Sequence, residues 1–330
     1  MSLYTSQDVM YYLLNTVGGG SQDLEQRILR SAISHAYRDV IFARDWLWHT
    51  ASEEIVTEYA ATSLIEGQQS RVATEYLLPH GCKNIDSLFT PQPDGTPKGL
   101  FFWQYLSPTD FNRFMAQGFI DFQDAYFTVI PAGPQFHNRW KLCVSNQLDA
   151  GTTMQFTYRR QPKDLVLFGS EPSSRTGTVS VSALGYEVTG TSTDFPARAS
   201  GSILRLSDNA TNVPEPTDGL HPYVWQGLID SVNSDTSLSL LESLGTTYDG
   251  VRYCISDYLD VSPGMFTAVL SYSELWYARL SGKPIDTAAA VASRDIRAAF
   301  ETDQVVPISG RRRPHALPSW ANALAFPTRI

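Results

Sequence analysis

Residues 24–48, LEQRILRSAISHAYRDVIFARDWLW, pass from a helical pattern into an aromatic stretch. Apolar residues recur with the i, i+4, i+8 spacing of one helix face, as at Leu24, Ile28 and Ala32. This spacing predicts a helix from about residue 22 to residue 46. The WLW at the end of the stretch predicts an aromatic hinge into a region of different periodicity.

A shorter helix is predicted before this one, over residues 6–17. Thr5 and Asp8 fit the S/T-x-x-D/E capping pattern ahead of an apolar face. The glycines at 18–20 end the helix, because glycine readily leaves helical backbone angles. They follow a helix and have no lysine behind them, so we interpret them as a linker and not as a phosphate-binding loop.

Helices return near the C-terminus. Ser262-Pro263 predicts the cap and first turn of a helix over 263–280, and a second apolar stripe predicts a helix over 287–302. An amphipathic helix needs a partner for its apolar face. We therefore predict that the N- and C-terminal helix pairs pack together as one four-helix bundle.

Between the helix pairs the apolar period changes from 3.6 to 2, and β-branched and aromatic runs alternate with Gly, Pro and Asn. The predicted fold class is α+β: a four-helix bundle with inserted antiparallel β-modules and an extended C-terminal arm. The expected segments are a first half-bundle (1–50), a β-sandwich-like module (51–170), a second small β-module (171–260), the second half-bundle (261–304) and the arm (305–330).

Charge is unevenly distributed along the chain. The net charge is −9, yet residues 172–259 carry ten acids against four arginines, and residues 309–330 carry four arginines and no acid. A duplex-binding protein usually has a basic surface, so the whole chain does not fit that class. An acidic body with a basic tail predicts a separate role for the tail.

The sequence contains no recognisable catalytic motif or metal-binding spacing. Its three cysteines are far apart, and its six histidines never lie at i, i+2 or i+4. We interpret the acids at Glu53-Glu54 and at Asp121 and Asp124 as solvated. We predict a protein that is not an enzyme and has no cofactor, no metal, no secretion signal and no membrane span.

Two groups of residues are candidate interaction sites. Trp46, Trp48, Phe101 and Trp103 are candidates for a subunit interface, because aromatic residues dominate interface cores. For the run over residues 100–105, which contains Phe101 and Trp103, packing in the sandwich core is the other interpretation. Arg311, Arg312, Arg313 and Trp320 are candidates for a partner-binding arm, since arginine pairs with carboxylates or phosphates and a tryptophan can anchor; a solvated end is the alternative there.

Several stretches resemble the head-to-tail adaptor (connector) proteins of tailed bacteriophages, similar to the tail tubular protein A family of short-tailed phages. The likeness is carried by short motifs in helix exits, strand pairs and closing helices. These are Arg44-Asp45-Trp46-Leu47-Trp48, Tyr76-Leu77-Leu78-Pro79, Ile85-Asp86-Ser87-Leu88 and Leu275-Trp276-Tyr277-Ala278. Residues 177–195 and 229–240 are similar to a small module common in phage structural proteins.

The resemblance implies a homododecamer ring, part of the virion neck and made in the host cytoplasm, which joins the portal protein to the tail. Its partners would be the portal, a tail nozzle or tube protein, fibres, and DNA passing non-specifically through the exit channel. The arm of such proteins docks onto the portal, and an acidic wall lets DNA slide. The large acidic second module departs from simpler adaptors. The alternatives are a receptor- or carbohydrate-binding tail component and, third, a hydrolase.

Overall fold

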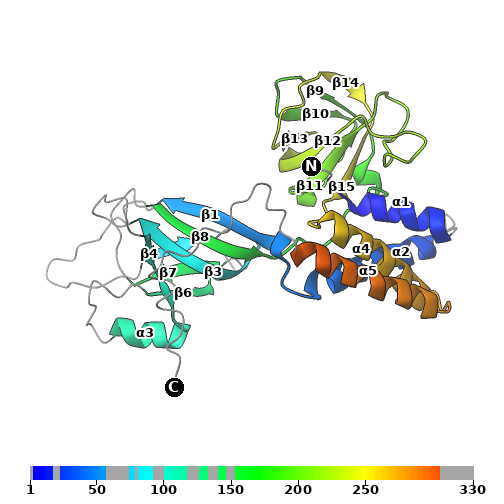
Figure 1. The fold of residues 1–330 in the computed structure, drawn as a ribbon. Coiled ribbons are helices and arrows are strands. Elements are labelled where there is room, and N and C mark those ends of the chain that lie inside the picture. Colours follow the sequence, from blue (N-terminus) through cyan, green and yellow to red (C-terminus); the bar gives the residue numbers. More distant parts are fainter. Residues whose placement is uncertain are drawn as a thin grey trace, which may run out of the picture. The chain divides into compact units, whose positions relative to one another are not determined.

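The computed structural model describes residues 3–17, 23–56, 74–78, 81–91, 100–116, 126–132, 140–145 and 153–304. Figure 1 labels the helices and strands of the chain. The chain divides into two compact units. One, here called the β unit, comprises Met1–Asp8 and Ala43–Asp260; the other, the helical unit, comprises Val9–Phe42 and Val261–Ile330. The helical unit is thus built from two distant parts of the sequence.

In the helical unit, α2 (Asp23–Phe42) packs on α4 (Pro263–Leu280), and α4 packs on α5 (Asp286–Gln304). Ser262 caps α4, as predicted, because its side chain accepts a hydrogen bond from the Met265 amide. A helix that contacts two others must be apolar on more than one side. The residues of α4 that are buried are Met265, Ala268, Val269, Ser271, Ser273, Leu275, Tyr277 and Ala278.

The predicted four-helix bundle is wrong. The described residues form five α-helices and three sheets, of which the largest is a seven-stranded antiparallel sheet. The first helix, α1 (Ser6–Val17), has its first turn in the β unit, where Asp8 pairs with Arg205. Amphipathic spacing shows that a helix needs a partner, but it does not identify the partner.

Two four-stranded sheets form a sandwich, with strand orders β1-β8-β3-β4 and β2-β7-β6-β5. Both sheets contribute side chains to one core, which includes Leu88, Phe127, Leu142 and Phe156. The strands and the short helix of this module are β1 (Thr50–Val56), β2 (Thr74–Leu77), β3 (Cys82–Pro91), β4 (Leu100–Phe102), β5 (Gln104–Tyr105), α3 (Pro108–Ala116), β6 (Tyr126–Pro131), β7 (Trp140–Val144) and β8 (Thr153–Arg160).

The aromatic run over residues 100–105 is divided between the two sheets. β4 pairs with β3 in the first sheet, whereas β5 pairs with β6 in the second. Trp103 lies at the division: its amide donates to the Leu88 carbonyl at 3.0 Å, and its side chain is buried in the core. The weak alternation of this run reflects a change of sheet.

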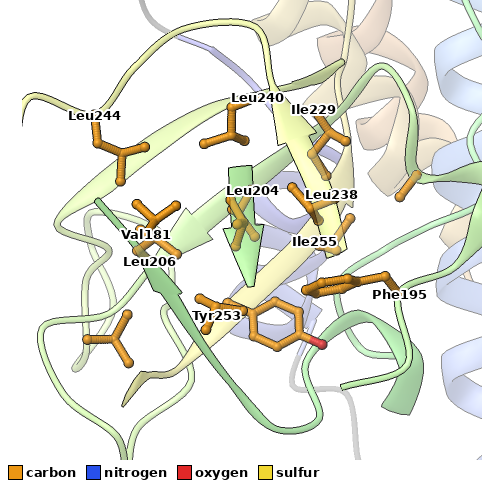
Figure 2. Packing of buried hydrophobic residues seen from close by; sticks show 14 of the residues in the cluster. Val181, Phe195, Leu204, Leu206, Ile229, Leu238, Leu240, Leu244, Tyr253 and Ile255 are labelled. Carbon is orange, nitrogen blue, oxygen red and sulfur yellow. The ribbon is translucent and has the colours of Figure 1, made fainter. Parts of the chain in front are cut away.

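The second β-module is a single sheet of order β14-β9-β10-β13-β12-β11-β15, with every neighbouring pair antiparallel. Its core is mainly aliphatic, with Phe195 and Tyr253 packed edge to face (Figure 2). The strands are β9 (Thr178–Val181), β10 (Glu187–Thr191), β11 (Ser202–Leu206), β12 (Trp225–Ser234), β13 (Ser237–Leu240), β14 (Tyr248–Val251) and β15 (Tyr253–Asp257).

Candidate functional site

One carboxylate, that of Asp260, holds both ends of the chain segment that forms the sandwich. Trp48 Nε1 donates to Asp260 Oδ1 at 3.0 Å, and Arg160 Nη2 lies 3.2 Å from the same oxygen. The ring nitrogen Nε2 of His49 lies 2.9 Å from the Asp260 carbonyl oxygen. We call these four residues the Asp260 junction. It fixes where the chain enters the sandwich and where it leaves.

Charge and burial at the junction also affect Tyr258. Burial raises the pKa of its hydroxyl, the negative charge of Asp260 raises it further, and the positive charge of Arg160 partly offsets this. Asp260 itself is buried. A buried carboxylate that accepts hydrogen bonds from a charged guanidinium and an indole is a structural anchor, because both donors satisfy its charge.

The two predicted interface tryptophans of the hinge occupy different environments. Trp46 has no exposed area, and its carbonyl accepts a hydrogen bond from Arg159 Nη1 at 2.9 Å. Arg44 stacks on the Trp46 ring, with 5.6 Å from its guanidinium carbon to the ring centroid. Trp48 is half-buried in the junction. The structure therefore places Trp46 inside the folded chain and leaves Trp48 partly accessible.

The other two aromatic candidates lie in the sandwich. Trp103 is buried, and its Nε1 donates to the Thr90 hydroxyl at 3.3 Å, so its polar atom is satisfied within the chain. Phe101 stands opposite Thr90 in the β3–β4 pair, and its side chain lies outside the described atoms. A core position for Trp103 agrees with the alternative interpretation of this run.

The predicted arm residues Arg311, Arg312, Arg313 and Trp320 lie outside the described residues, which end at 304. Their role as a partner-binding segment stays a prediction. What the sequence provides is their chemistry: four arginines without an acid over 309–330, and one tryptophan among small and apolar residues.

Sequence reasoning missed two polar anchors of the seven-stranded sheet. Asp8 pairs with Arg205 through two bonds, Nη1 to Oδ1 at 2.7 Å and Nη2 to Oδ2 at 2.8 Å. Asp257 accepts from the Leu167 amide and the Ser202 hydroxyl, each at 2.7 Å, and from the Val166 amide. No local signal could have paired Asp8 with a residue so distant in the sequence.

A group of exposed apolar side chains was also missed. Leu184 is 86% exposed, Tyr186 55% and Leu241 57%. They lie on two adjoining segments, because the Leu240 amide donates to the Tyr186 carbonyl at 2.7 Å and the Gly245 amide donates to the Ala183 carbonyl at 2.9 Å. The sequence signal was a large apolar residue on either side of Gly185, in a turn where polar residues are usual.

The three cysteines are buried thiols. Burial is the main cause that raises the pKa of Cys82 and Cys143 to about 11 and that of Cys254 to about 12. A thiol with so high a pKa is protonated at neutral pH and is a poor nucleophile.

Within the described ranges, His, Cys, Asp and Glu side chains do not gather in groups of three or more that could hold a metal ion. A search of the same residues for a helix long and apolar enough to cross a membrane found none. No model of a known protein family matches the sequence, and a search of curated proteins found no match.

Proposed function

We propose that this chain is a non-enzymatic structural protein of a tailed phage, a head-to-tail adaptor that forms a ring between portal and tail. The observation that carries the proposal is the discontinuous helical unit. Residues 9–42 and 261–304 belong to one compact body, and the β-structure is inserted between them in the sequence. This arrangement of inserted β-structure is also the organisation that the adaptor resemblance implies.

The anchoring of the insertion supports a structural role. The Asp260 junction ties residues 48–49 to residue 160, so the sandwich is held at both of its connections. A ring subunit must present its modules in fixed positions to its neighbours and partners, and buried charge-assisted hydrogen bonds supply that rigidity.

Two further observations agree with this role. The buried, protonated thiols leave the cysteines unsuited to nucleophilic chemistry. The net charge of −9 suits a channel wall along which anionic DNA passes without sticking. In this proposal the ring is a homododecamer in the virion neck, with the portal on one side and a tail nozzle or tube, and fibres, on the other.

The test is assembly on a portal. The full-length chain is mixed with the portal protein of the same virus, and the complex is imaged by electron microscopy. The expected result is a closed ring of this chain seated on the portal. A trimeric spike would contradict the proposal and favour the alternative receptor- or carbohydrate-binding tail component. A chain that stays monomeric and does not bind the portal protein would also contradict the proposal.

A matched pair of variants tests whether the Asp260 junction supports ring formation. Asp260→Asn removes a junction charge and is expected to weaken ring formation. Asp208→Asn removes an exposed carboxylate from a loop of the seven-stranded sheet and is expected to leave ring formation unchanged. Equal behaviour of the two variants would show that the junction does not support assembly.

A further inference from the structure

Asp-Gly pairs give this chain a chemistry that is independent of the proposed ring. The sequence contains three of them, at Asp94-Gly95, Asp218-Gly219 and Asp249-Gly250. The first lies outside the described residues, and the other two lie in the second β-module. In such a pair the backbone nitrogen of the glycine can attack the carboxyl carbon of the aspartate, because glycine has no Cβ to shield that nitrogen.

The reaction is spontaneous and needs only water. The glycine nitrogen bonds to Cγ of the protonated aspartate, the amide proton and the carboxyl hydroxyl leave together as water, and a cyclic imide results. Water then adds to the main-chain carbonyl of the imide and breaks its bond to nitrogen, so the backbone continues through Cγ as isoaspartate. No atom is gained or lost overall, but the backbone becomes one carbon longer at that position.

Asp249-Gly250 is held against this reaction by one hydroxyl. Ser180 Oγ donates to Asp249 Oδ1 at 2.7 Å and accepts a hydrogen bond from the Gly250 amide at 3.0 Å. The first bond favours the ionised carboxylate, which is a poor electrophile, and the second keeps the proton on the nitrogen that would have to attack. The pair also lies within β14, whose pairing with β9 on both sides of it limits the backbone movement that the attack requires.

Asp218-Gly219 has no such hydroxyl. Asp218 is exposed, and within the described part of the chain its carboxylate has no hydrogen-bond or ion-pair partner. The pair lies in a turn, where the Gly219 amide donates to the Pro216 carbonyl at 2.9 Å. That bond holds the amide but leaves the carboxyl group free to rotate toward the nitrogen.

We propose that Asp218-Gly219 is a site of spontaneous isoaspartate formation in this protein, and that Ser180 protects Asp249-Gly250 from the same change. The two pairs have the same chemistry and lie in the same module. The difference between them is what holds the carboxylate and the backbone around it.

Isoaspartate at this turn is expected to disturb the buried charge of the module. The turn is closed by two backbone bonds, from the Glu215 amide to the His221 carbonyl at 2.8 Å and from the Tyr223 amide to the Glu215 carbonyl at 3.0 Å. Tyr223 covers Arg205, with 4.5 Å from the guanidinium carbon to the ring centroid. An extra backbone carbon inside the turn strains these bonds, so the cover that Tyr223 gives to Arg205 should loosen as the protein ages.

The first experiment compares the two pairs. The folded full-length chain is kept for several weeks at neutral pH, and isoaspartate is measured at each pair by mass spectrometry with fragmentation that distinguishes it from aspartate. Residue 218 is expected to accumulate it at least about tenfold faster than residue 249, since losing a hydrogen bond to a charged group shifts an equilibrium by about this factor. Equal rates in the folded chain, or no isoaspartate at residue 218, would overturn the proposal.

The same chain unfolded in urea is the reference. Both pairs should then react at similar rates, because neither the Ser180 hydroxyl nor the pairing of β14 remains in place. If the unfolded chain kept the difference seen in the folded one, the neighbouring sequence and not the fold would set the rates, and the proposal would be wrong.

Variants of Ser180 test the protection directly. Ser180→Ala removes the hydroxyl and should raise the rate at residue 249 about tenfold. Ser180→Thr keeps a hydroxyl and should leave the rate near its original value. The matched control, Ser239→Ala, removes a hydroxyl from β13 and should not change the rate at residue 249. A rate that stays the same or falls in Ser180→Ala would show that the hydroxyl does not protect the pair.

Asp218→Glu tests the consequence for Arg205. Glutamate keeps the charge, but its longer side chain would have to close a larger ring, which forms much more slowly, so residue 218 should stay unmodified. Aged wild-type protein is expected to show faster amide hydrogen exchange in β11, which contains Arg205, than fresh protein, and the aged variant should not. The same change in both aged proteins would overturn the link between the turn and Arg205.

Discussion

The two β-modules of this chain bury their cores in different ways. The sandwich fills the space between two sheets with large side chains, among them Trp103, Phe127, Phe156 and Met154. The seven-stranded sheet surrounds mainly Leu, Val and Ile, contributed by strands of one sheet and by its connections. Facing sheets lie about 10 Å apart, and aromatic rings span that gap efficiently. A single sheet that encloses its own core can use shorter side chains.

The modules also differ in where they place charge. The seven-stranded sheet buries Arg205 and satisfies it with Asp8, Gln7 and Gln226, beneath the ring of Tyr223. The sandwich keeps its ion pairs nearer the surface, as between Lys141 and Glu75. Burial, and not the number of ion pairs, therefore decides how much an ion pair contributes to stability.

The largest loss in the free energy of unfolding is expected for Arg205→Met. The change leaves Asp8 without its cation in a nearly buried site, and breaking a buried pair costs about 3–5 kcal/mol. Amide hydrogen exchange, resolved by peptide, should show this loss of stability across the seven-stranded sheet. Lys141→Met, which breaks the exposed pair of the sandwich, is the control and should have little effect. A loss of similar size in both variants would refute the role assigned to burial.

A slightly smaller loss of stability is expected for substitutions in the hydrophobic cores of the two modules. Leu204→Ala removes a fully buried side chain from the aliphatic core and should cost about 3 kcal/mol, because the tight surroundings cannot close the cavity. Met154→Leu keeps the volume in the aromatic core and should cost less than about 1.5 kcal/mol. Chemical denaturation gives both values. If Leu204→Ala were tolerated better than Met154→Leu, the aliphatic core would not be closely packed.

The junction joins the two modules within the β unit, and we expect Asp260→Asn to cost about 1 kcal/mol. The amide can still accept from Trp48, but it loses the charge that holds the partly exposed Arg160. Faster hydrogen exchange is expected in residues 47–50 and 159–163, with the core of each module unchanged. Exchange that rises equally in the seven-stranded core would show that Asp260 supports more than the junction.

The smallest expected effect is a loss of stability at alkaline pH. Burial, and then the hydrogen bond to Glu53, raise the pKa of Tyr158 above the ordinary tyrosine value, and burial also raises the pKa of Tyr253. Both groups therefore add stability below about pH 10, and this stability is lost as the pH rises toward the folded-state pKa. Both modules should therefore weaken progressively as the pH rises above about 10.

The variant Glu53→Gln distinguishes the titration of Tyr158 from that of Tyr253. It should bring the ionisation of Tyr158 to lower pH, because a charged acceptor is replaced by a neutral one, and it should leave Tyr253 unchanged. Ultraviolet difference absorbance measures tyrosine ionisation. If both tyrosines titrated as before, burial alone would account for the raised pKa of Tyr158.

The local features of the chain could be predicted from its sequence. Thr5 and Asp8 form the predicted capping pair, in which the Thr5 amide donates to Asp8 Oδ2 at 2.8 Å. The helix predicted over 22–46 is present as Asp23–Phe42, and the helix predicted over 263–280 is present as Pro263–Leu280. These features depend on residues a few positions apart, whose spacing and hydrogen-bonding groups can be seen directly in the sequence.

The tertiary structure settles which elements meet. It paired Thr50 with Arg159 across the β1–β8 ladder, joined Asp8 to Arg205, and divided the run around Trp103 between two sheets. It also placed Trp46 inside the chain, where the sequence had suggested an interface. Periodicity determines which face of an element must be buried, whereas the partner depends on contacts among residues far apart, which compete in packing and charge across the whole fold.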